Sequence, residues 1–192
     1  MIDNIKIEST EILSDNWYTL KKIKYSYHKE NGSVHTQTRE AYDRGNGATI
    51  LLYNPVTKTV ILTRQFRLPT FINGNETGML IEACAGLLDD ENPEDCICRE
   101  TEEETGYAVN NVKKVFEAYM SPGSVTEILY FFIAEYSSAM KVNEGGGKED
   151  EEENIEVLEI SIDEAMKMVD DGRVKDAKTI MLLLYIKLNN IL

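Results

Sequence analysis

The stretch that decides the fold is residues 86–106, which read GLLDDENPEDCICRETEEETG. Its second half predicts a helix with a clear start, because Asn92 can cap free backbone N–H groups and Pro93 suits the first helical position. The carboxylate of Glu94 favours the positive end of such a helix, and Gly106 favours its termination. We therefore expect one helix that begins at Pro93 and ends before Gly106.

Three carboxylates recur at helical spacing on this segment. Glu100, Glu103 and Glu104 stand at positions i, i+3 and i+4, so a helix places them on one face, where like charges repel. A hard divalent cation such as Mg²⁺ would compensate, because it takes carboxylate oxygens and bridges to phosphates. The alternative is an acidic helix face that only meets solvent.

The spacing around this acidic face argues against the solvent alternative. From Gly86 to Gly106 the chain follows the pattern G-x4-E-x7-R-E-x-x-E-E-x-G. For a chain of this composition, the six fixed positions from Glu91 onward match by chance on the order of one time in ten thousand. The pattern resembles the box of the Nudix hydrolases, with a loop after Gly86 that is one residue shorter and with Thr101 and Tyr107 at two aliphatic positions.

Further stretches resemble the nucleoside-diphosphate-sugar pyrophosphatase branch of that family, and the short box loop is typical of its subgroup that acts on GDP-mannose. They are residues 38–43 (TREAYD), 45–48 (GNGA), 64–67 (RQFR), 81–86 (IEACAG), 119–123 (YMSPG) and the acidic segment around 150–151. The resemblance implies Mg²⁺-dependent hydrolysis of the pyrophosphate of a nucleotide sugar, with GDP-mannose as the first expectation. The position of residues 121–123 also resembles the ADP-ribose pyrophosphatases, and a non-catalytic nucleotide-binding module is a further alternative.

The resemblance also implies roles for the acidic residues. The metal ligands would be Glu100, Glu104, the backbone carbonyl of Ala85 and Glu151, with Mg²⁺ as the expected cofactor and Mn²⁺ as a second option. The catalytic set would be Glu103, Glu104 and Glu151, where Glu103 is a further ligand or the base that orients water. Asp150 and Glu152 compete with Glu151 for its role, Arg99 is expected to form a structural ion pair, and Glu82 is expected to brace the box.

Substrate contacts are expected from residues spread over the chain. Arg67 can fork onto a phosphate or be a plain surface arginine, and Lys178 could reach the sugar phosphate. Trp17 could stack on the base or pack in the core. Glu127 could bind a hydroxyl or support a residue that contacts the substrate. The complete set expected to bind substrate is Trp17, Thr38, Arg39, Glu40, Arg67, Ala85, Gly86, Leu87, Glu104, Glu127, Asp150, Glu151 and Lys178.

Composition excludes several other classes. The chain has 192 residues with 34 acidic and 20 basic side chains, a formal charge of −14 that argues against nucleic acid as a partner. The longest apolar run, Ile180–Ile186, is far below the ~20 residues of a membrane span, and the first residues do not resemble a signal peptide. We therefore expect a cytoplasmic protein with no membrane partner. Three cysteines and two histidines argue against zinc, so oxygen atoms must hold any metal.

Elsewhere the chain alternates strand-like and helix-like segments, which predicts an α+β domain with a mixed sheet. The resemblance makes this a Nudix fold, a mixed β-sheet between helices, over residues 43–192. Residues 1–42 are expected to form a small β lobe with too little core to be stable alone. The resemblance implies that this lobe is exchanged between the subunits of a homodimer, and we expect the same here. The expected strands are residues 20–27 and 34–38 around Asn31-Gly32, then 48–53, 59–66, 79–84, 112–119, 128–136 and 155–160; helices are expected at 161–172 and 176–190.

Overall fold

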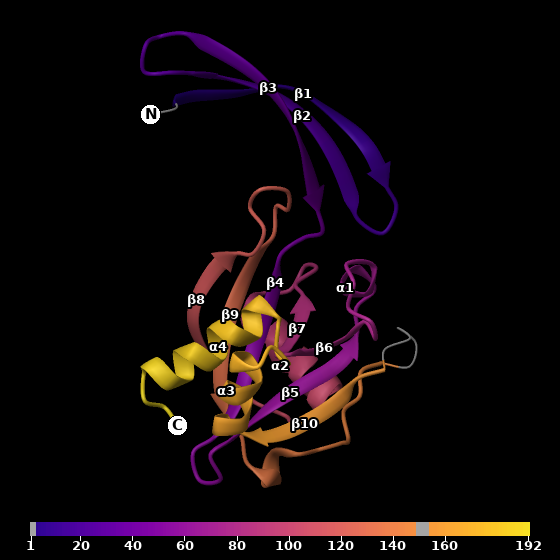
Figure 1. The fold of residues 1–192 in the computed structure, drawn as a ribbon, viewed down its shortest axis with the longest axis vertical. Coiled ribbons are helices and arrows are strands. Elements are labelled where there is room, and N and C mark those ends of the chain that lie inside the picture. Colours follow the sequence, from indigo (N-terminus) through magenta and orange to yellow (C-terminus); the bar gives the residue numbers. More distant parts are fainter. Residues whose placement is uncertain (1–2, 149–153) are drawn as a thin grey trace. The chain divides into compact units, whose positions relative to one another are not determined.

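The computed structural model describes residues 3–148 and 154–192, and the chain divides into two compact units (Figure 1). The first unit comprises Met1–Asn46 together with Tyr119–Ile128, and the second comprises Gly47–Ala118 and Leu129–Leu192. The segment Tyr119–Ile128 therefore groups with the lobe, although it is distant from the lobe in sequence. Among the described residues, no helix is long and apolar enough to cross a membrane.

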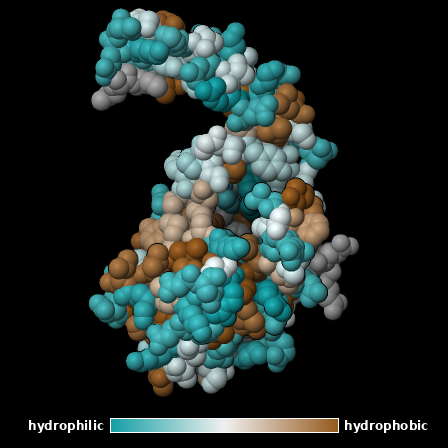
Figure 2. Space-filling model, viewed as in Figure 1, coloured by the Kyte–Doolittle hydropathy of each residue, from teal (hydrophilic) through white to brown (hydrophobic). Residues whose placement is uncertain are grey.

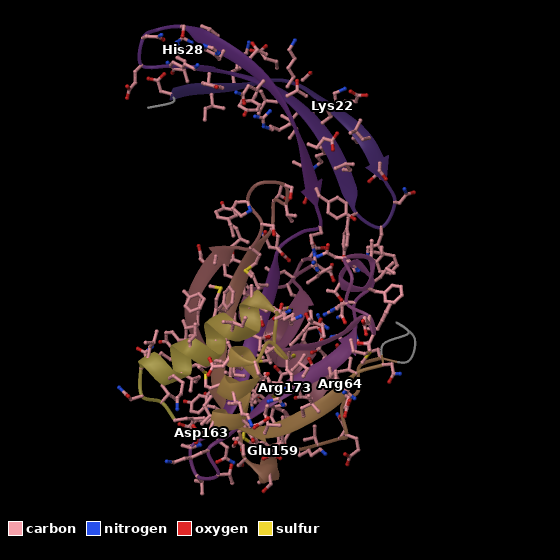
Figure 3. The ribbon with its side chains drawn as sticks, viewed as in Figure 1. Lys22, His28, Arg64, Glu159, Asp163 and Arg173 are labelled. Carbon is pink, nitrogen blue, oxygen red and sulfur yellow. The ribbon has the colours of Figure 1, made fainter. Side chains whose placement is uncertain are left out.

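The first unit contains a three-stranded antiparallel sheet in the order β1-β2-β3, formed by β1 (Asp3–Asp15), β2 (Thr19–His28) and β3 (Val34–Asp43). The expected hairpin between β2 and β3 is confirmed, and Gly32 in its turn has a positive φ of 78°. On β2, Lys22 lies opposite Glu11 of β1, 3.1 Å from its carboxylate, and opposite Glu40 of β3 (Figure 3). Cross-strand charge pairs of this kind support the register of the sheet.

The second unit is built on a mixed sheet, as expected. Its main path runs in the order β10-β5-β4-β9-β8, while β6 pairs with β5 and β7 with β4. The central pair β4 and β9 is parallel, whereas β4 pairs antiparallel with β5 and β7. The strands are β4 (Gly47–Asn54), β5 (Thr59–Phe66), β6 (Met79–Glu82), β7 (Cys84–Leu87), β8 (Lys113–Tyr119), β9 (Ile128–Glu135) and β10 (Glu156–Ser161).

Helices lie on both sides of this sheet. The helical segments are α1 (Leu68–Ile72), α2 (Pro93–Thr105), η1 (Ser138–Met140), α3 (Ile162–Asp170) and α4 (Ala177–Leu188). Figure 1 shows α3 and α4 in front of the sheet and α2 behind it. The first six residues of β4 are buried, and Ile50 and Leu52 share one core cluster with Ile97 of α2. A strand covered on both faces has few polar residues, which explains why residues 48–52 are apolar apart from the buried Thr49.

Capping residues in the sequence mark both ends of α2 and the start of α3. At the start of α2, the Asn92 side chain accepts hydrogen bonds from the backbone N–H groups of Glu94 and Asp95, and Gly106 ends the helix in the left-handed conformation at φ 79°. At the start of α3, the Ser161 hydroxyl accepts from the N–H of Glu164 at 3.2 Å. The capping residues predicted for α2 are therefore confirmed, and a serine side chain caps α3.

The prediction of a single strand at residues 79–84 is wrong. The segment forms two strands that pair with different neighbours, β6 with β5 and β7 with β4, and the chain changes partner at Ala83. The N–H of Ala83 donates to the Thr179 hydroxyl of α4 at 2.6 Å. A side chain outside the sheet thus satisfies the backbone group at the break, and this allows the chain to leave one strand for the other. As a result, Ala85 and Gly86 lie on β7, which contacts α2.

Candidate active site

The acidic face of α2 is organised by Arg99. One terminal nitrogen of Arg99 donates to Glu100 and to Glu103, at 2.9 Å in each case. The remaining guanidinium nitrogens reach Glu91 at 3.1 and 3.0 Å. The hydrogen bond to Glu91, with the neighbouring carboxylates, holds the pKa of Arg99 above its usual value. The expected structural ion pair is therefore confirmed, and it connects the first glutamate of the box to two carboxylates on the helix.

Glu104 occupies the most buried position of the three helix carboxylates, with 2% of the residue exposed. It interacts with the buried thiol of Cys84 on β7. Burial raises the pKa of the Cys84 thiol well above its ordinary value, and the Glu104 carboxylate raises it further, so the thiol stays protonated at neutral pH. Cys84 can therefore donate its proton to Glu104 in a hydrogen bond.

Strand β7 runs along the same helix. A Cβ atom added to Gly86 would overlap the carboxyl end of the Glu100 side chain, so this glycine provides the space in which that carboxylate lies. The next residue, Leu87, accepts a hydrogen bond from the Cys96 thiol at 3.1 Å through its backbone carbonyl. Ala85, expected to supply a carbonyl ligand, precedes Gly86 on β7, the strand that contacts α2.

The segment that follows β9 is tied to the end of α2. The N–H groups of Gly146 and Gly147 donate to the backbone carbonyls of Glu104 and Glu103, at 2.9 and 3.1 Å. The Lys148 ammonium lies 3.1 Å from the Glu103 carboxylate. The next expected site residues, Asp150 and Glu151, and their competitor Glu152, lie outside the described residues.

The donor set of this region suits a hard cation. In the part of the chain that the structure describes, the ion pairs of this region join Glu91, Glu100 and Glu103 to Arg99 and Lys148. With Glu104, these side chains have four formal negative charges and two positive ones, a sum of −2. Carboxylate oxygens are the ligands that Mg²⁺ prefers, and a divalent ion would balance this charge. Within residues 3–148 and 154–192, no three His, Cys, Asp or Glu side chains already converge into a metal-binding group.

Two of the expected phosphate-binding residues are brought together by a third side chain. Arg67 donates through Nε to one carboxylate oxygen of Glu82 at 2.7 Å, and Lys178 donates to the other at 2.6 Å. Arg67 follows β5 and Lys178 lies in the first turn of α4, so residues far apart in sequence meet at the end of β6. The sequence had suggested that Glu82 braces the box, and its contact with both cations was not foreseen.

The remaining substrate candidates lie in the first unit. Trp17 is 86% exposed, so the alternative that it packs in a core is wrong for this chain. Its ring meets Tyr18 edge-on, Arg44 lies over the Tyr18 ring at 5.4 Å, and Arg44 pairs with Glu127 at 3.6 Å. Trp17 and Glu127 are therefore connected through two residues that sequence reasoning missed. Their positions were the only sequence signal, because Tyr18 follows the single tryptophan and Arg44 directly precedes the stretch 45–48.

Three consecutive candidates of the first unit, Thr38, Arg39 and Glu40, stand on β3 and are all exposed. Arg39 donates through a terminal nitrogen to the carbonyl of Thr38 at 2.9 Å. The two units are described separately, so this group and the acidic helix face are each characterised within their own unit.

Comparisons with known proteins agree with the geometry of the second unit. Residues 43–183 match the family model of the NUDIX domain, and residues 4–42 match the model of the GDP-mannose pyrophosphatase NudK N-terminal domain. The chain is 61% identical over 183 residues to a GDP-mannose pyrophosphatase of Pectobacterium atrosepticum, covering 95% of this chain and 94% of the relative. It is 53% identical over 192 residues to a GDP-mannose pyrophosphatase of Escherichia coli, covering both chains completely.

A solved structure shares the fold. The crystal structure of an ADP compounds hydrolase superposes with a TM-score of 0.70, covering 96% of this chain and 93% of that one, at 18% sequence identity. At this identity the likeness concerns the fold alone. Together with the family model, it confirms the expected fold class, a mixed sheet between helices with an additional β lobe.

Proposed function

Because the chain belongs to the Nudix hydrolase family, we propose that it hydrolyses the pyrophosphate of GDP-mannose to GMP and mannose 1-phosphate. The observation that carries this proposal is the identity of 53–61% to GDP-mannose pyrophosphatases along essentially the whole chain. The lobe model that matches residues 4–42 belongs to the same enzymes, so the likeness is not limited to the box.

In the proposed site, Mg²⁺ would be held by Glu100, Glu104, the backbone carbonyl of Ala85 and Glu151, with Mn²⁺ as an alternative ion. When bound, the ion neutralises the carboxylates, polarises a phosphoryl oxygen and lowers the pKa of water. The role of Glu151 rests on the family resemblance, because that residue lies outside the described part of the chain. The oxygen-only donor set and the formal charge of −2 on the described side chains support the choice of a divalent ion.

The protein side chains perform the remaining steps. Arg67 and Lys178 bind the diphosphate, and Arg99 keeps Glu100 and Glu103 in place through its ion pairs. Glu103 or Glu151 accepts a proton from the attacking water. The new P–O bond forms as the bridging P–O bond breaks, and the departing phosphate takes the bridging oxygen as GMP and mannose 1-phosphate separate. Trp17 and Glu127 contact the nucleoside, and Thr38, Arg39 and Glu40 contact the nucleotide from β3.

A substrate panel tests the proposal. With Mg²⁺ and the full chain, GDP-mannose should be hydrolysed with a kcat/KM at least about tenfold above that of ADP-ribose. A site that hydrogen-bonds the polar groups of one base discriminates against a base on which those groups differ. Chromatography of the products in ¹⁸O-water shows which phosphorus is attacked, through the label in GMP or in mannose 1-phosphate. Faster hydrolysis of ADP-ribose would identify ADP-ribose, and not GDP-mannose, as the substrate. No turnover of any nucleotide sugar would indicate a non-catalytic binding module.

We propose further that the protein is a cytoplasmic homodimer in which residues 1–42 are exchanged between subunits. Strand β1 supports this, since Ile5, Ile7 and Ile12 are 66%, 57% and 59% exposed in a single chain. Figure 2 shows apolar side chains among mainly hydrophilic ones on the visible face of the lobe. Three strands with so little covered apolar surface are marginal on their own, and a second copy would cover them.

The assembly can be measured directly. Sedimentation equilibrium of the full chain at micromolar concentration should give twice the 21.8 kDa of one chain. Deletion of residues 1–40 should yield a monomer or an aggregating protein, because it removes the cover of a partner subunit. A monomeric full chain would rule out the dimer, and a well-behaved truncated dimer would rule out the exchange.

A further inference from the structure

Glu82, at the end of β6, is a buried carboxylate with 3% of the residue exposed, and it contacts two cations at once. Arg67 donates to one of its oxygens at 2.7 Å and Lys178 to the other at 2.6 Å. A buried ion pair adds little net stability compared with well-packed apolar residues, because desolvation of the charges offsets their attraction. Stability therefore does not explain why a charged residue lies at this buried position.

The two cations remain available for a ligand in different ways. Among the described residues, Arg67 uses only Nε for its contact with Glu82, and its two terminal nitrogens donate to no protein acceptor. The Arg67 side chain is also 40% exposed. Since a guanidinium is planar and rigid, a bond at Nε fixes the orientation of the whole fork, and the terminal edge is the one that binds phosphate in bidentate fashion.

Lys178 is held more tightly. Its side chain is 12% exposed and lies 3.1 Å from the Asp176 carboxylate in addition to Glu82. Asp176 is the N-cap of α4 and accepts from the N–H and hydroxyl of Thr179, while the same hydroxyl accepts from the N–H of Ala83. The ammonium is thus fixed to the corner between β6 and β7, next to the strand that carries Ala85 and Gly86.

The charges of this cluster are balanced before any ligand arrives. The carboxylates of Glu82 and Asp176 match the cations of Arg67 and Lys178. Without Glu82, the two cations would repel each other and turn toward solvent. With it, the Arg67 cation, which follows β5, and the Lys178 cation of α4 are held on the two oxygens of one carboxylate, an arrangement suited to adjacent phosphates.

We propose that Glu82 is a positioning residue that holds Arg67 and Lys178 side by side so that both bind the diphosphate of the substrate. The proposal rests on the proposed function, which assigns these two cations to the substrate. Glu82 touches neither the substrate nor the reacting atoms in this arrangement. Its effect reaches the reaction only through the two cations.

The test combines Glu82→Gln with Arg67→Ala and Lys178→Ala in steady-state kinetics with GDP-mannose and Mg²⁺. An amide has one acceptor oxygen and one N–H₂ donor, so Gln at this position can serve one cation while repelling the other. Glu82→Gln should raise KM about tenfold and change kcat less than about threefold, because it removes binding and not chemistry. In the Arg67→Ala background, Glu82→Gln should raise KM only about threefold, because only Lys178 then remains for Glu82 to position.

Asp176→Asn is the matched control. Asn caps a helix as well as Asp does, so this change removes a charge from Lys178 but keeps α4 and does not touch Glu82 or Arg67. In the double variant Asp176→Asn/Arg67→Ala, the increase in KM should equal the product of the increases in the two single variants. If circular dichroism shows that Glu82→Gln is unfolded, Glu82→Asp, which keeps the charge on a shorter stem, enters the same cycle with the same expectation.

The outcomes separate this inference from the function it rests on. An equal KM factor for the Glu82 variant in the wild-type and Arg67→Ala backgrounds would overturn the role of Glu82 alone. If Arg67→Ala and Lys178→Ala both leave KM unchanged, the assignment of these cations to the substrate is wrong, and the role of Glu82 falls with it. A loss of kcat with unchanged KM in Glu82→Gln would also overturn the positioning role.

Discussion

Glu104→Gln is expected to lower kcat by at least about a thousandfold while the protein stays folded, since metal assistance contributes several kcal/mol of transition-state stabilisation. The residue is 2% exposed on the acidic face of α2, and the substitution keeps its volume. An amide oxygen can still accept the hydrogen of the Cys84 thiol. Removing one of three neighbouring like charges relieves repulsion, so the melting temperature should be unchanged or higher.

Glu102→Gln is the matched control for this prediction. Glu102 is exposed on the same helix, so the change in charge and size is identical but lies away from the carboxylate face. Its kcat should stay within about twofold, as for other surface substitutions. Titration calorimetry with Mg²⁺ should show weakened metal binding only for Glu104→Gln. If Glu104→Gln retains most of its turnover, the residue does not hold the metal.

The same assay extends to the acidic loop. Glu151→Gln should lower kcat strongly, whereas Asp150→Asn and Glu152→Gln should have mild effects. If Glu152→Gln is the inactive variant, the register taken from the family is wrong by one residue. If all three are active, the base must be sought on the helix, with Glu103 first.

Local signals explain why much of the second unit could be predicted. Asn92, Gly106 and Ser161 act within one turn of their own helices, so the sequence contains all the information that determines those helix ends. The i, i+3, i+4 spacing of Glu100, Glu103 and Glu104 likewise needs only a helix to become one face. The Arg99–Glu103 ion pair, at i, i+4, follows from the same geometry, whereas Glu91 reaches Arg99 from the loop before the helix.

What could not be predicted depends on contacts between distant residues. The partner change at Ala83 depends on the Thr179 hydroxyl, 96 positions away in sequence. The Lys178–Glu82 pair likewise joins residues 96 positions apart. The exposure of Trp17 is a property of a lobe with little core of its own, where an apolar residue has no interior to enter. Composition and periodicity do not encode such pairings, which arise only when the sheet and α4 come together.

Gly86→Ala is expected to lower kcat/KM about a hundredfold, because a displacement of about 1 Å in a positioned group costs that much. A Cβ atom at this position would overlap the Glu100 carboxyl group, the end of a flexible side chain that can move aside. The backbone of Gly86 has no positive φ, so alanine is not strained there, and the melting temperature should fall by only a few degrees. The loss of activity should be accompanied by a higher Mg²⁺ concentration needed for half-maximal rate, since Glu100 is displaced from the acidic face.

Two comparisons decide whether space for Glu100 is the reason for this glycine. Gly123→Ala is the control, because its added Cβ would meet nothing within 4 Å and its φ is also not positive, so activity should be unchanged. Shortening the displaced side chain in the double variant Gly86→Ala/Glu100→Asp should recover part of the Mg²⁺ affinity lost in Gly86→Ala, as removal of one methylene makes room for the alanine methyl group. Wild-type metal affinity in Gly86→Ala would show that Glu100 does not hold the metal from this position. A large loss of stability without recovery in the double variant would show that the glycine serves the packing of β7 on α2.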